Sequence, residues 1–231
     1  MTCDQNFKAH DLTKVAQIQR AKFRRVGLFV DWNSQILEAP REFEDEPVER
    51  CRYALKRVGK LVTKHLCRME EDCVFRVQVR LYHGWTAGVT QTANRRAFNS
   101  VSEFTEPDEI FSSARVLSLA DVQFGDRLLD ALPNRQNARL QIHLPNTYRR
   151  QHGDEKPTEK MVDTALASDL LSWAKSDPSS IALVVSNDDD AIPPIYVAEA
   201  WMKPFGGSVH LLRSAARGDS RYLLLDGILI R

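Results

Sequence analysis

Several features that mark other classes of protein are missing from this sequence of 231 residues. Residues 1–23 contain no continuous apolar stretch, so we expect no secretory signal peptide, and no apolar run approaches the length that spans a bilayer. The four cysteines form no C-x-x-C pair and have no zinc-like spacing with the six histidines. We therefore expect a cytoplasmic protein, not associated with a membrane, whose cysteines are reduced and mostly structural.

The short motifs of common nucleotide-binding and hydrolase folds are also missing. The sequence has neither G-x-x-x-x-G-K-[ST] nor G-x-G-x-x-G, which excludes the usual phosphate-binding loops, and it has no G-x-S-x-G nucleophile elbow. A haloacid-type phosphatase would need D-x-D after the first strand, where this chain has Asp31 followed by Trp32 and Asn33. The net charge of +1 gives no global attraction to a polyanion, so any nucleic-acid binding must come from local patches.

What the sequence does contain is an alternation of strand and helix patterns. Apolar, β-rich runs predict strands, and apolar positions three and four residues apart predict helices. The expected strands are 26–30, 75–81, 115–122, 139–144, Ile181–Val185 and Ser208–Leu212, with a last apolar run at 222–230; the expected helices are Pro47–Met69, 90–101, 163–174 and 190–202. This order predicts an α/β fold with a mainly parallel central sheet. Residues 151–160 are polar and predict an exposed loop.

Three acids from distant parts of the chain are expected to meet at one edge of that sheet. Asp31 directly ends the first strand, and Asp188 follows the Ile181–Val185 strand after two residues. Asp163 begins a helix whose start lies at the same edge in a right-handed crossover, and ligands bind at this edge of parallel sheets. Carboxylates so close together repel. A bound Mg²⁺ or Mn²⁺ would relieve that repulsion and could activate water for attack on a phosphate.

Each acid also has a plainer interpretation. Asp31 could end a strand or cap a turn, Asp163 could be a first-turn acid that faces the helix dipole, and Asp190 could cap a helix. Asp189 is most simply a solvated loop acid. Asp169 lies about 120° round the helix from Asp163, which is consistent with a surface group or with a group that supports the site. Only the joint pattern favours a metal site.

That joint pattern resembles the NYN family, a branch of the PIN-like nucleases. The matching segments are GLFVDWN (27–33), EKMVDTALASD (159–169) and LVVSNDDD (183–190), followed by the Gly206-Gly207 turn and its strand. The resemblance implies a three-layer α/β/α PIN-like fold, dependence on Mg or Mn, and cleavage of RNA. It matches Asp31, Asp163 and Asp188 to the catalytic, metal-binding acids, Asp190 to a further metal-binding acid, and Asn33 to a polar partner. PIN-like relatives often dimerise, which leaves a homodimer open.

The sequence departs from the family pattern at several positions. Asn33 follows Asp31 by two residues instead of three, Met161 and Asn187 replace glycines, and Ala191 replaces an aromatic residue. The expected organisation is an N-terminal helical or flexible arm at 1–25 and a single nuclease domain at 26–231, with an insertion at about 85–150 that the family pattern does not match. The alternative is a catalytically inactive PIN-like module that binds RNA or a protein.

Basic side chains could contact a phosphate backbone. Lys56, Lys60 and Lys64 recur every four residues on the Pro47–Met69 helix, with Arg57 and Arg68 nearby, and we assign this stripe to substrate binding, although most such stripes are solvated helix faces. Other basic clusters are Arg20, Lys22, Arg24 and Arg25, and Arg149 with Arg150. Trp32 could stack on a base and His83 could reach the site, but a core tryptophan and a structural histidine are the simpler interpretations.

Overall fold

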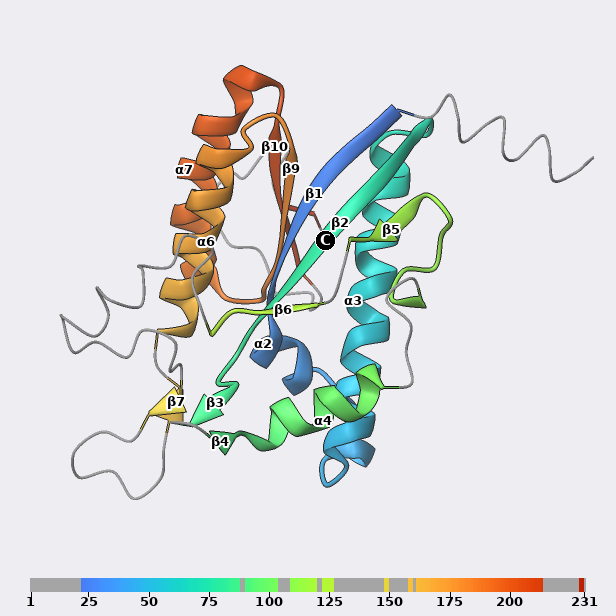
Figure 1. Ribbon diagram of the computed structural model, residues 1–231, viewed down its shortest axis with the longest axis vertical. Helices are drawn as coiled ribbons and strands as arrows, with labels where there is room; N and C mark the ends of the chain where they lie inside the picture. Colours follow the sequence, from blue (N-terminus) through green and yellow to red (C-terminus); the bar gives the residue numbers. More distant parts are fainter. Residues whose placement is uncertain are drawn as a thin grey trace, which may run out of the picture.

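The computed structural model describes residues 22–87, 90–103, 109–119, 122–126, 148–149, 158–159, 161–213 and 229–230. These residues form a twisted central sheet with helices on both faces (Figure 1). The expected α/β class with a mainly parallel sheet is confirmed, and the layers are compatible with a three-layer α/β/α arrangement.

The central sheet has seven strands, and every strand pair in it is parallel. The strand order is β11-β10-β9-β1-β2-β5, with β6 also paired to β2. The bounds are β1 Lys22–Asp31, β2 Cys73–Tyr82, β5 Val116–Ser118, β6 Gln123–Phe124, β9 Ile181–Val185, β10 Ser208–Leu212 and β11 Leu229–Ile230. The central strand β1 pairs with β2 over its whole length and with β9 over its second half, so its end at Asp31 lies in the middle of the sheet edge.

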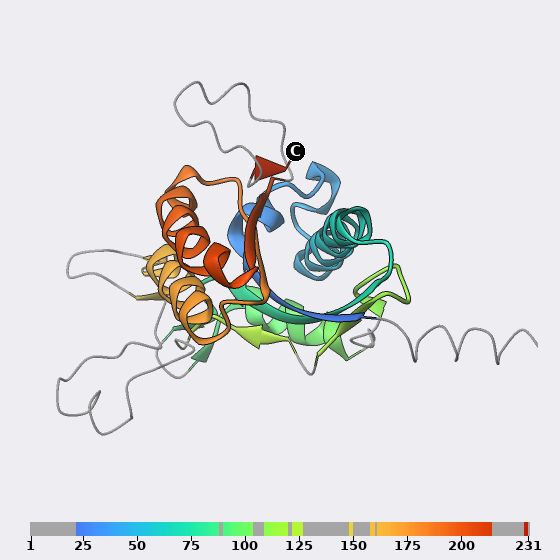
Figure 2. The same ribbon diagram turned by 90° about the horizontal axis from the view of Figure 1, so that it is seen from above.

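Helices cover the two faces of this sheet unequally. One face is covered by α2 (Trp32–Leu37) and α3 (Pro47–Met69), and the other by α6 (Val162–Ser176) and α7 (Ile192–Met202) (Figure 2). Helix α4 (Ala93–Ser102) packs against α3. Short 3-10 turns occur at η1 Arg41–Phe43, η3 Asp189–Ala191 and η4 Lys203–Phe205. Residues 26–30 of β1 and the whole of β9 are buried on both sides, so these segments are continuous non-polar runs and do not alternate.

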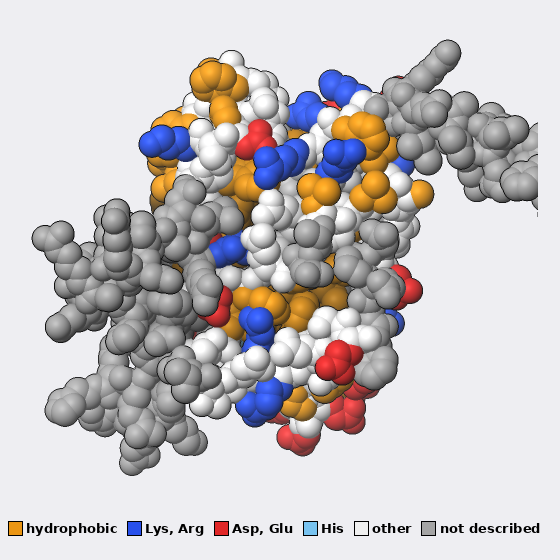
Figure 3. Space-filling model, viewed as in Figure 1, with side chains coloured by type: hydrophobic (Ala, Val, Ile, Leu, Met, Phe, Trp, Pro, Cys, Tyr) orange, Lys and Arg blue, Asp and Glu red, His pale blue; other side chains and the backbone are white. Residues whose placement is uncertain are grey.

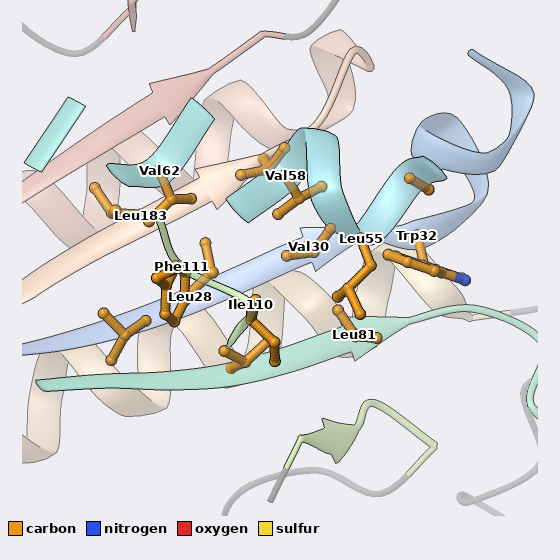
Figure 4. Close-up of a cluster of buried hydrophobic side chains, with 14 of the residues drawn as sticks. Leu28, Val30, Trp32, Leu55, Val58, Val62, Leu81, Ile110, Phe111 and Leu183 are labelled. Carbon is orange, nitrogen blue, oxygen red and sulfur yellow. The ribbon is translucent and has the colours of Figure 1, made fainter. Parts of the chain in front are cut away.

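Each face of the sheet has its own hydrophobic core. On the α3 side, Val58 and Val62 of the helix pack over Leu28 and Leu183 of neighbouring strands (Figure 4). On the other side, α6 and α7 pack over the opposite faces of the same strands. Apolar positions three and four residues apart in α3 place one stripe of the helix in the core, which explains why its bounds agree with the sequence pattern.

A second, four-stranded sheet of short strands lies beside the main one. Its order is β4-β3-β7-β8, with bounds β3 Thr86–Ala87, β4 Thr90–Gln91, β7 Tyr148–Arg149 and β8 Thr158–Glu159. Strands β7 and β8 pair antiparallel, so Thr158 and Glu159 belong to a strand. For these two residues the expectation of an exposed loop over 151–160 is wrong; the remainder of that segment lies outside the described residues.

Several expected boundaries shift. Strand β1 begins at Lys22, so residues 22–25 belong to the sheet and not to an N-terminal arm; residues 1–21 lie outside the described part. The helix expected over 190–202 is a 3-10 turn followed by α7, with the two prolines in the first turn of α7. The strand expected at 115–122 is shorter, and the one at 139–144 falls outside the described residues.

Two further expectations concern membranes and cysteines. None of the helices in the described ranges is both long and apolar enough to cross a membrane. Cys51, Cys67 and Cys73 are free thiols, in agreement with the expectation of reduced cysteines, and Cys3 lies outside these ranges. Burial raises the pKa of Cys51 to about 12, although Arg52 lowers it slightly, so this thiol is an inert core residue.

A buried ion pair ties helix α6 to the sheet. Asp169 is fully buried; its Oδ2 accepts from the Tyr82 hydroxyl at 2.8 Å and forms an ion pair with Arg80, whose Nε lies 2.7 Å away. Burial and then the charge of Asp169 raise the pKa of Tyr82, so the tyrosine remains a neutral donor. Asp169 is therefore neither a surface group nor a lining residue of the pocket described below; it holds α6 in place.

We predict that Asp169→Asn destabilises the protein by about 3 kcal/mol, because it leaves the buried Arg80 guanidinium without its counter-charge. Denaturant unfolding measures this change. The matched control is Asp177→Asn, which removes the partner of Arg25 in a more exposed ion pair at 3.1 Å and should cost less than about 1 kcal/mol. Equal losses in the two variants would show that the Arg80 pair has no special structural role.

Candidate active site

A pocket opens at the carboxyl edge of the central sheet. Its volume is about 290 Å³. The lining residues come from the end of β1 with α2, from β8, from the start of α6 and from the loop after β9: Asp31, Asn33, Ser34, Leu37, Glu159, Met161, Val162, Asp163, Asn187 and Asp188. The three acids expected to meet therefore line one cavity, at the sheet edge where the sequence placed them.

Asp31 is fixed in the pocket by two donors. It is buried and serves as the N-cap of α2, where its Oδ1 accepts from the Ser34 N–H at 3.2 Å. Its Oδ2 accepts from the Ser186 hydroxyl at 3.0 Å. Asp31 thus caps a helix, as the plainer interpretation held, and it also lines the pocket; its expected role in binding a metal stays a prediction. Helix α2 itself was not expected.

Asp188 is placed by the turn that follows β9. Its N–H donates to the Ser186 hydroxyl at 3.0 Å, so one serine links Asp31 to Asp188. Its Oδ1 accepts from the Asp190 N–H at 3.1 Å, which makes Asp188 the N-cap of η3. The capping role proposed for Asp190 therefore belongs to Asp188. Asp190 is exposed and does not line the pocket.

Asp189 is exposed but not simply solvated. Its carboxylate forms an ion pair with Arg213, a buried residue directly after β10. The pair joins the ends of two neighbouring strands and turns the Asp189 charge away from the pocket lining. This contact explains why one acid of the Asp188–Asp190 run lines the cavity and the others do not.

Asp163 lies in the first turn of α6, beside a residue in an unusual backbone conformation. Met161 is the N-cap of α6 and has φ 63° and ψ 13°, the left-handed region that favours glycine. It is the one non-glycine residue with positive φ in the part of the chain that the structure describes. The family pattern has glycine here. The sharp turn at Met161 lets the chain pass from β8 into α6 with both Glu159 and Asp163 on the pocket.

The pKa of Asp163 is affected by its burial and by the acids around it. Withdrawal from solvent, and then the negative charges of Asp31, Asp188, Asp190 and Glu159, raise the pKa of its carboxyl. The positive end of the α6 dipole favours the charged form and offsets part of this repulsion. Burial is the larger cause and the neighbouring acids add to it, so the charged form of Asp163 is disfavoured in this pocket.

Glu159 is a pocket acid that sequence reasoning did not assign, although it opens the second matching segment. Its Oε1 accepts from the Gly84 N–H at 2.6 Å and contacts the Nδ1 of buried His83, whose Nε2 in turn contacts Asn94. Desolvation acts to raise the pKa of Glu159, but the hydrogen bond and charge of His83 and the Gly84 N–H lower it overall. His83 is thus structural, as the simpler interpretation held, and it positions a pocket carboxylate.

The amide side chains of the pocket differ in how firmly they are held. Asn187 Nδ2 donates to Glu38 Oε1 at 3.2 Å, and Glu38 is held in turn by Arg57 at 3.3 Å. Asn33 lines the pocket from the first turn of α2, next to Asp31, as the resemblance implied. Helix α2 begins directly after Asp31, so Asn33, two residues after that acid, lies in the first turn of the helix.

The pocket is lined by the kind of oxygen atoms that bind a hard divalent cation, but its side chains do not lie close enough together to bind one as they stand. Asp31, Glu159, Asp163 and Asp188 all offer carboxylate oxygens, the donors that Mg²⁺ and Mn²⁺ prefer. Within the described ranges, however, no three Asp, Glu, His or Cys side chains are grouped closely enough to hold an ion. A cation bound here would therefore draw these carboxylates closer together than the structure has them.

The basic residues lie away from the pocket lining. Lys56, Lys60 and Lys64 are exposed along α3, so they form the expected stripe, but none of them lines the cavity. Arg57 does not extend this stripe, because its guanidinium donates to Gln35 and Glu38.

The second basic cluster is partly neutralised by ion pairs. Arg24 pairs with Glu70 at 3.3 Å and Arg25 with Asp177 at 3.1 Å. The side chains of Arg149 and Arg150, and the whole of Arg20, lie outside what the structure describes. Trp32 is fully buried against Trp85 and Phe98, so it is a core residue that cannot stack on a base.

Comparison with protein-family models, with curated proteins and with solved structures gives no match in any of the three. The resemblance to the NYN family therefore depends on the matching segments, and the geometry of the pocket has to be judged from its own residues.

We predict that Met161→Gly stabilises the protein by about 0.5–1 kcal/mol. Glycine removes the left-handed strain of a residue with Cβ, about 1–2 kcal/mol, and loses part of this gain to the greater freedom of the unfolded chain. Denaturant unfolding measures the change. Met161→Ala is the control, because alanine keeps Cβ and should give no gain; a gain of equal size in both variants would trace the effect to the exposed Met161 side chain and not to φ.

Proposed function

We propose that this protein is a Mg²⁺- or Mn²⁺-dependent nuclease of the PIN-like type that hydrolyses phosphodiester bonds, with RNA as its substrate class. The observation that carries the proposal is the pocket at the carboxyl edge of β1 and β9, lined by Asp31, Glu159, Asp163 and Asp188. RNA as substrate and the cytoplasmic location come from the sequence analysis and belong to the same proposal.

Within this proposal, Asp31, Asp163 and Asp188 hold the cation. When bound, it would supply the chemistry typical of such ions: a more acidic water and charge neutralisation on the phosphate. Ser34 and Ser186 keep both oxygens of Asp31 in fixed positions. A bound cation would therefore draw the other carboxylates toward Asp31, the acid that two donors already hold in place.

Glu159 and the polar side chains have supporting roles. Glu159 is held by His83 and Gly84, which lower the pKa of its carboxyl, so it adds a fixed negative charge to the acidic wall of the pocket. Asn33 and Asn187 add polar groups to the lining, and the Asn33 amide could donate to a phosphate oxygen. Leu37 and Val162 give the cavity an apolar rim.

A second candidate is supported by one specific observation. Since no three of the described acidic, histidine or cysteine side chains form a closed ligand group, the chain could be an inactive module that binds RNA or a protein partner. Incubation of the protein with a mixed RNA pool, with Mg²⁺ or Mn²⁺ and with chelator, separates the two. The nuclease shortens the RNA only with the ion, whereas the binding module shifts the RNA on a gel and leaves its length unchanged.

We predict that Asp188→Asn lowers the metal-dependent rate of RNA cleavage by at least about a hundredfold, the scale expected when a key electrostatic element is lost. The melting temperature without metal should stay the same or rise, because one of several clustered negative charges is removed. Rate and melting temperature are measured on the same preparations.

The matched control for this variant is Asp72→Asn, an exposed acid in the turn before β2, which should change neither quantity. Full metal-dependent activity in Asp188→Asn would show that this residue only caps η3. Loss of folding in the variant would assign Asp188 a structural role and remove it from the proposed chemistry.

We predict that the lysine stripe acts in binding and not in chemistry. Changing Lys56, Lys60 and Lys64 together to Gln should raise KM and flatten the dependence of binding on salt, because fewer counter-ions are released from the nucleic acid, and kcat should change little. Lys175→Gln, at an exposed position of α6 that belongs to none of the basic clusters, provides the control. An unchanged salt slope in the triple variant would identify the stripe as a solvated face.

A further inference from the structure

Arg57 differs from the lysines beside it on helix α3. Basic side chains lie at several separate places on the face that Figure 3 shows, so each of them has to be judged by its own contacts. Lys56, Lys60 and Lys64 are exposed, whereas the Arg57 side chain is only 22% exposed. Its guanidinium donates to helix α2 and to the residue that caps the end of α2. Arg57 therefore contacts the helix that forms one wall of the pocket.

One set of contacts leads from Arg57 to Asp31. Arg57 Nη2 donates to the backbone carbonyl of Gln35 at 3.3 Å and to its Oε1 at 3.2 Å. Because a guanidinium can only donate, fully buried Gln35 turns its oxygen toward Arg57. The other end of the Gln35 amide, Nε2, donates to the Ser34 hydroxyl at 2.9 Å. Ser34 in turn donates from its N–H to Asp31 Oδ1 at 3.2 Å and from its hydroxyl to the Asp31 carbonyl at 3.0 Å.

A second set of contacts leads from Arg57 to the loop after β9. Arg57 Nη1 donates to Glu38 Oε2 at 3.3 Å, and Glu38 Oε1 accepts from Asn187 Nδ2 at 3.2 Å. An ionised carboxylate can only accept, so Asn187 turns its NH₂ group toward Glu38. Asn187 is buried, lines the pocket and directly precedes Asp188. The same guanidinium is thus linked to two walls of the pocket.

We propose that Arg57 is a positioning residue of the active site, which fixes the α2 wall with Asp31 relative to the loop that carries Asp188. The proposal rests on the proposed nuclease function. Neither Arg57 nor its partners Gln35 and Glu38 belong to the lining of the pocket, so Arg57 acts through other residues. A guanidinium suits this role because its donors lie in a fixed plane and can serve two partners at once.

Helix α3 provides a rigid base for this contact. Its buried stripe, which includes Leu55 and Val58 on either side of Arg57, packs into the core of the sheet. A contact that only joined α3 to α2 would affect stability and leave turnover unchanged well below the melting temperature. A positioning role instead predicts a loss of kcat with KM retained, because the acids would be misplaced while the substrate-binding surface is intact.

Arg57→Lys tests this difference, because lysine keeps the charge but cannot hold Gln35 and Glu38 together. Metal-dependent RNA cleavage should lose at least about tenfold in kcat, and KM and the salt dependence of RNA binding should change by less than about twofold. The control Arg52→Lys makes the same change on the same helix, in an ion pair with Glu49 that is more exposed, and should alter none of these. An unchanged kcat in Arg57→Lys overturns the proposal, and so does a loss confined to KM and the salt slope.

The side-chain amide signals of Asn187 provide a measurement that needs no cleavage. In ¹H–¹⁵N correlation spectra of the full chain they are the pair that Asn187→Ala lacks. Arg57→Lys should shift this pair and Arg52→Lys should leave it in place. Unchanged Asn187 signals in Arg57→Lys overturn the positioning role, whereas an unaltered chain that cleaves no RNA contradicts the nuclease proposal alone.

A second variant keeps the test decisive if Arg57→Lys does not fold. Glu38→Ala removes only the link to Asn187 and leaves the contacts between Arg57 and Gln35 in place. It should shift the Asn187 amide signals and lower kcat by at least about fivefold with little change in KM. Full kcat in Glu38→Ala, measured well below its melting temperature, would show that the link from Arg57 to the loop after β9 does not position the site.

Discussion

The repulsion between carboxylates at one end of the sheet is the constraint on which the rest of this site depends. Like charges at short range cost free energy unless fixed donors or a cation compensate them. The chain provides donors for three of the acids: Ser34 and Ser186 for Asp31, His83 with Gly84 for Glu159, and the Asp190 N–H for Asp188. Burial, and after it the charges of the neighbouring acids, raises the pKa of Asp163.

The fold supplies the rigidity that this arrangement needs. The second half of strand β1 is paired on both sides and covered on both faces, so Asp31 ends a segment that is held from every side. The Arg80–Asp169 ion pair fixes the helix that carries Asp163, and Asp189–Arg213 fixes the turn that carries Asp188. The acids of the matching segments thus divide into two groups. Asp31, Asp163 and Asp188 line the pocket, whereas Asp169 and Asp189 hold the elements that carry them in place.

The sequence predicted those parts that depend on long-range periodicity. The bounds of α3, β9 and β10 agree because many buried positions define each of them, and Asp31, Asp163 and Asp188 meet because parallel strands end at one edge. Glu159 could not be found in this way, since its place depends on a two-residue strand and on His83, about 75 residues away. Helix α2 was missed because six residues are too few to show a period.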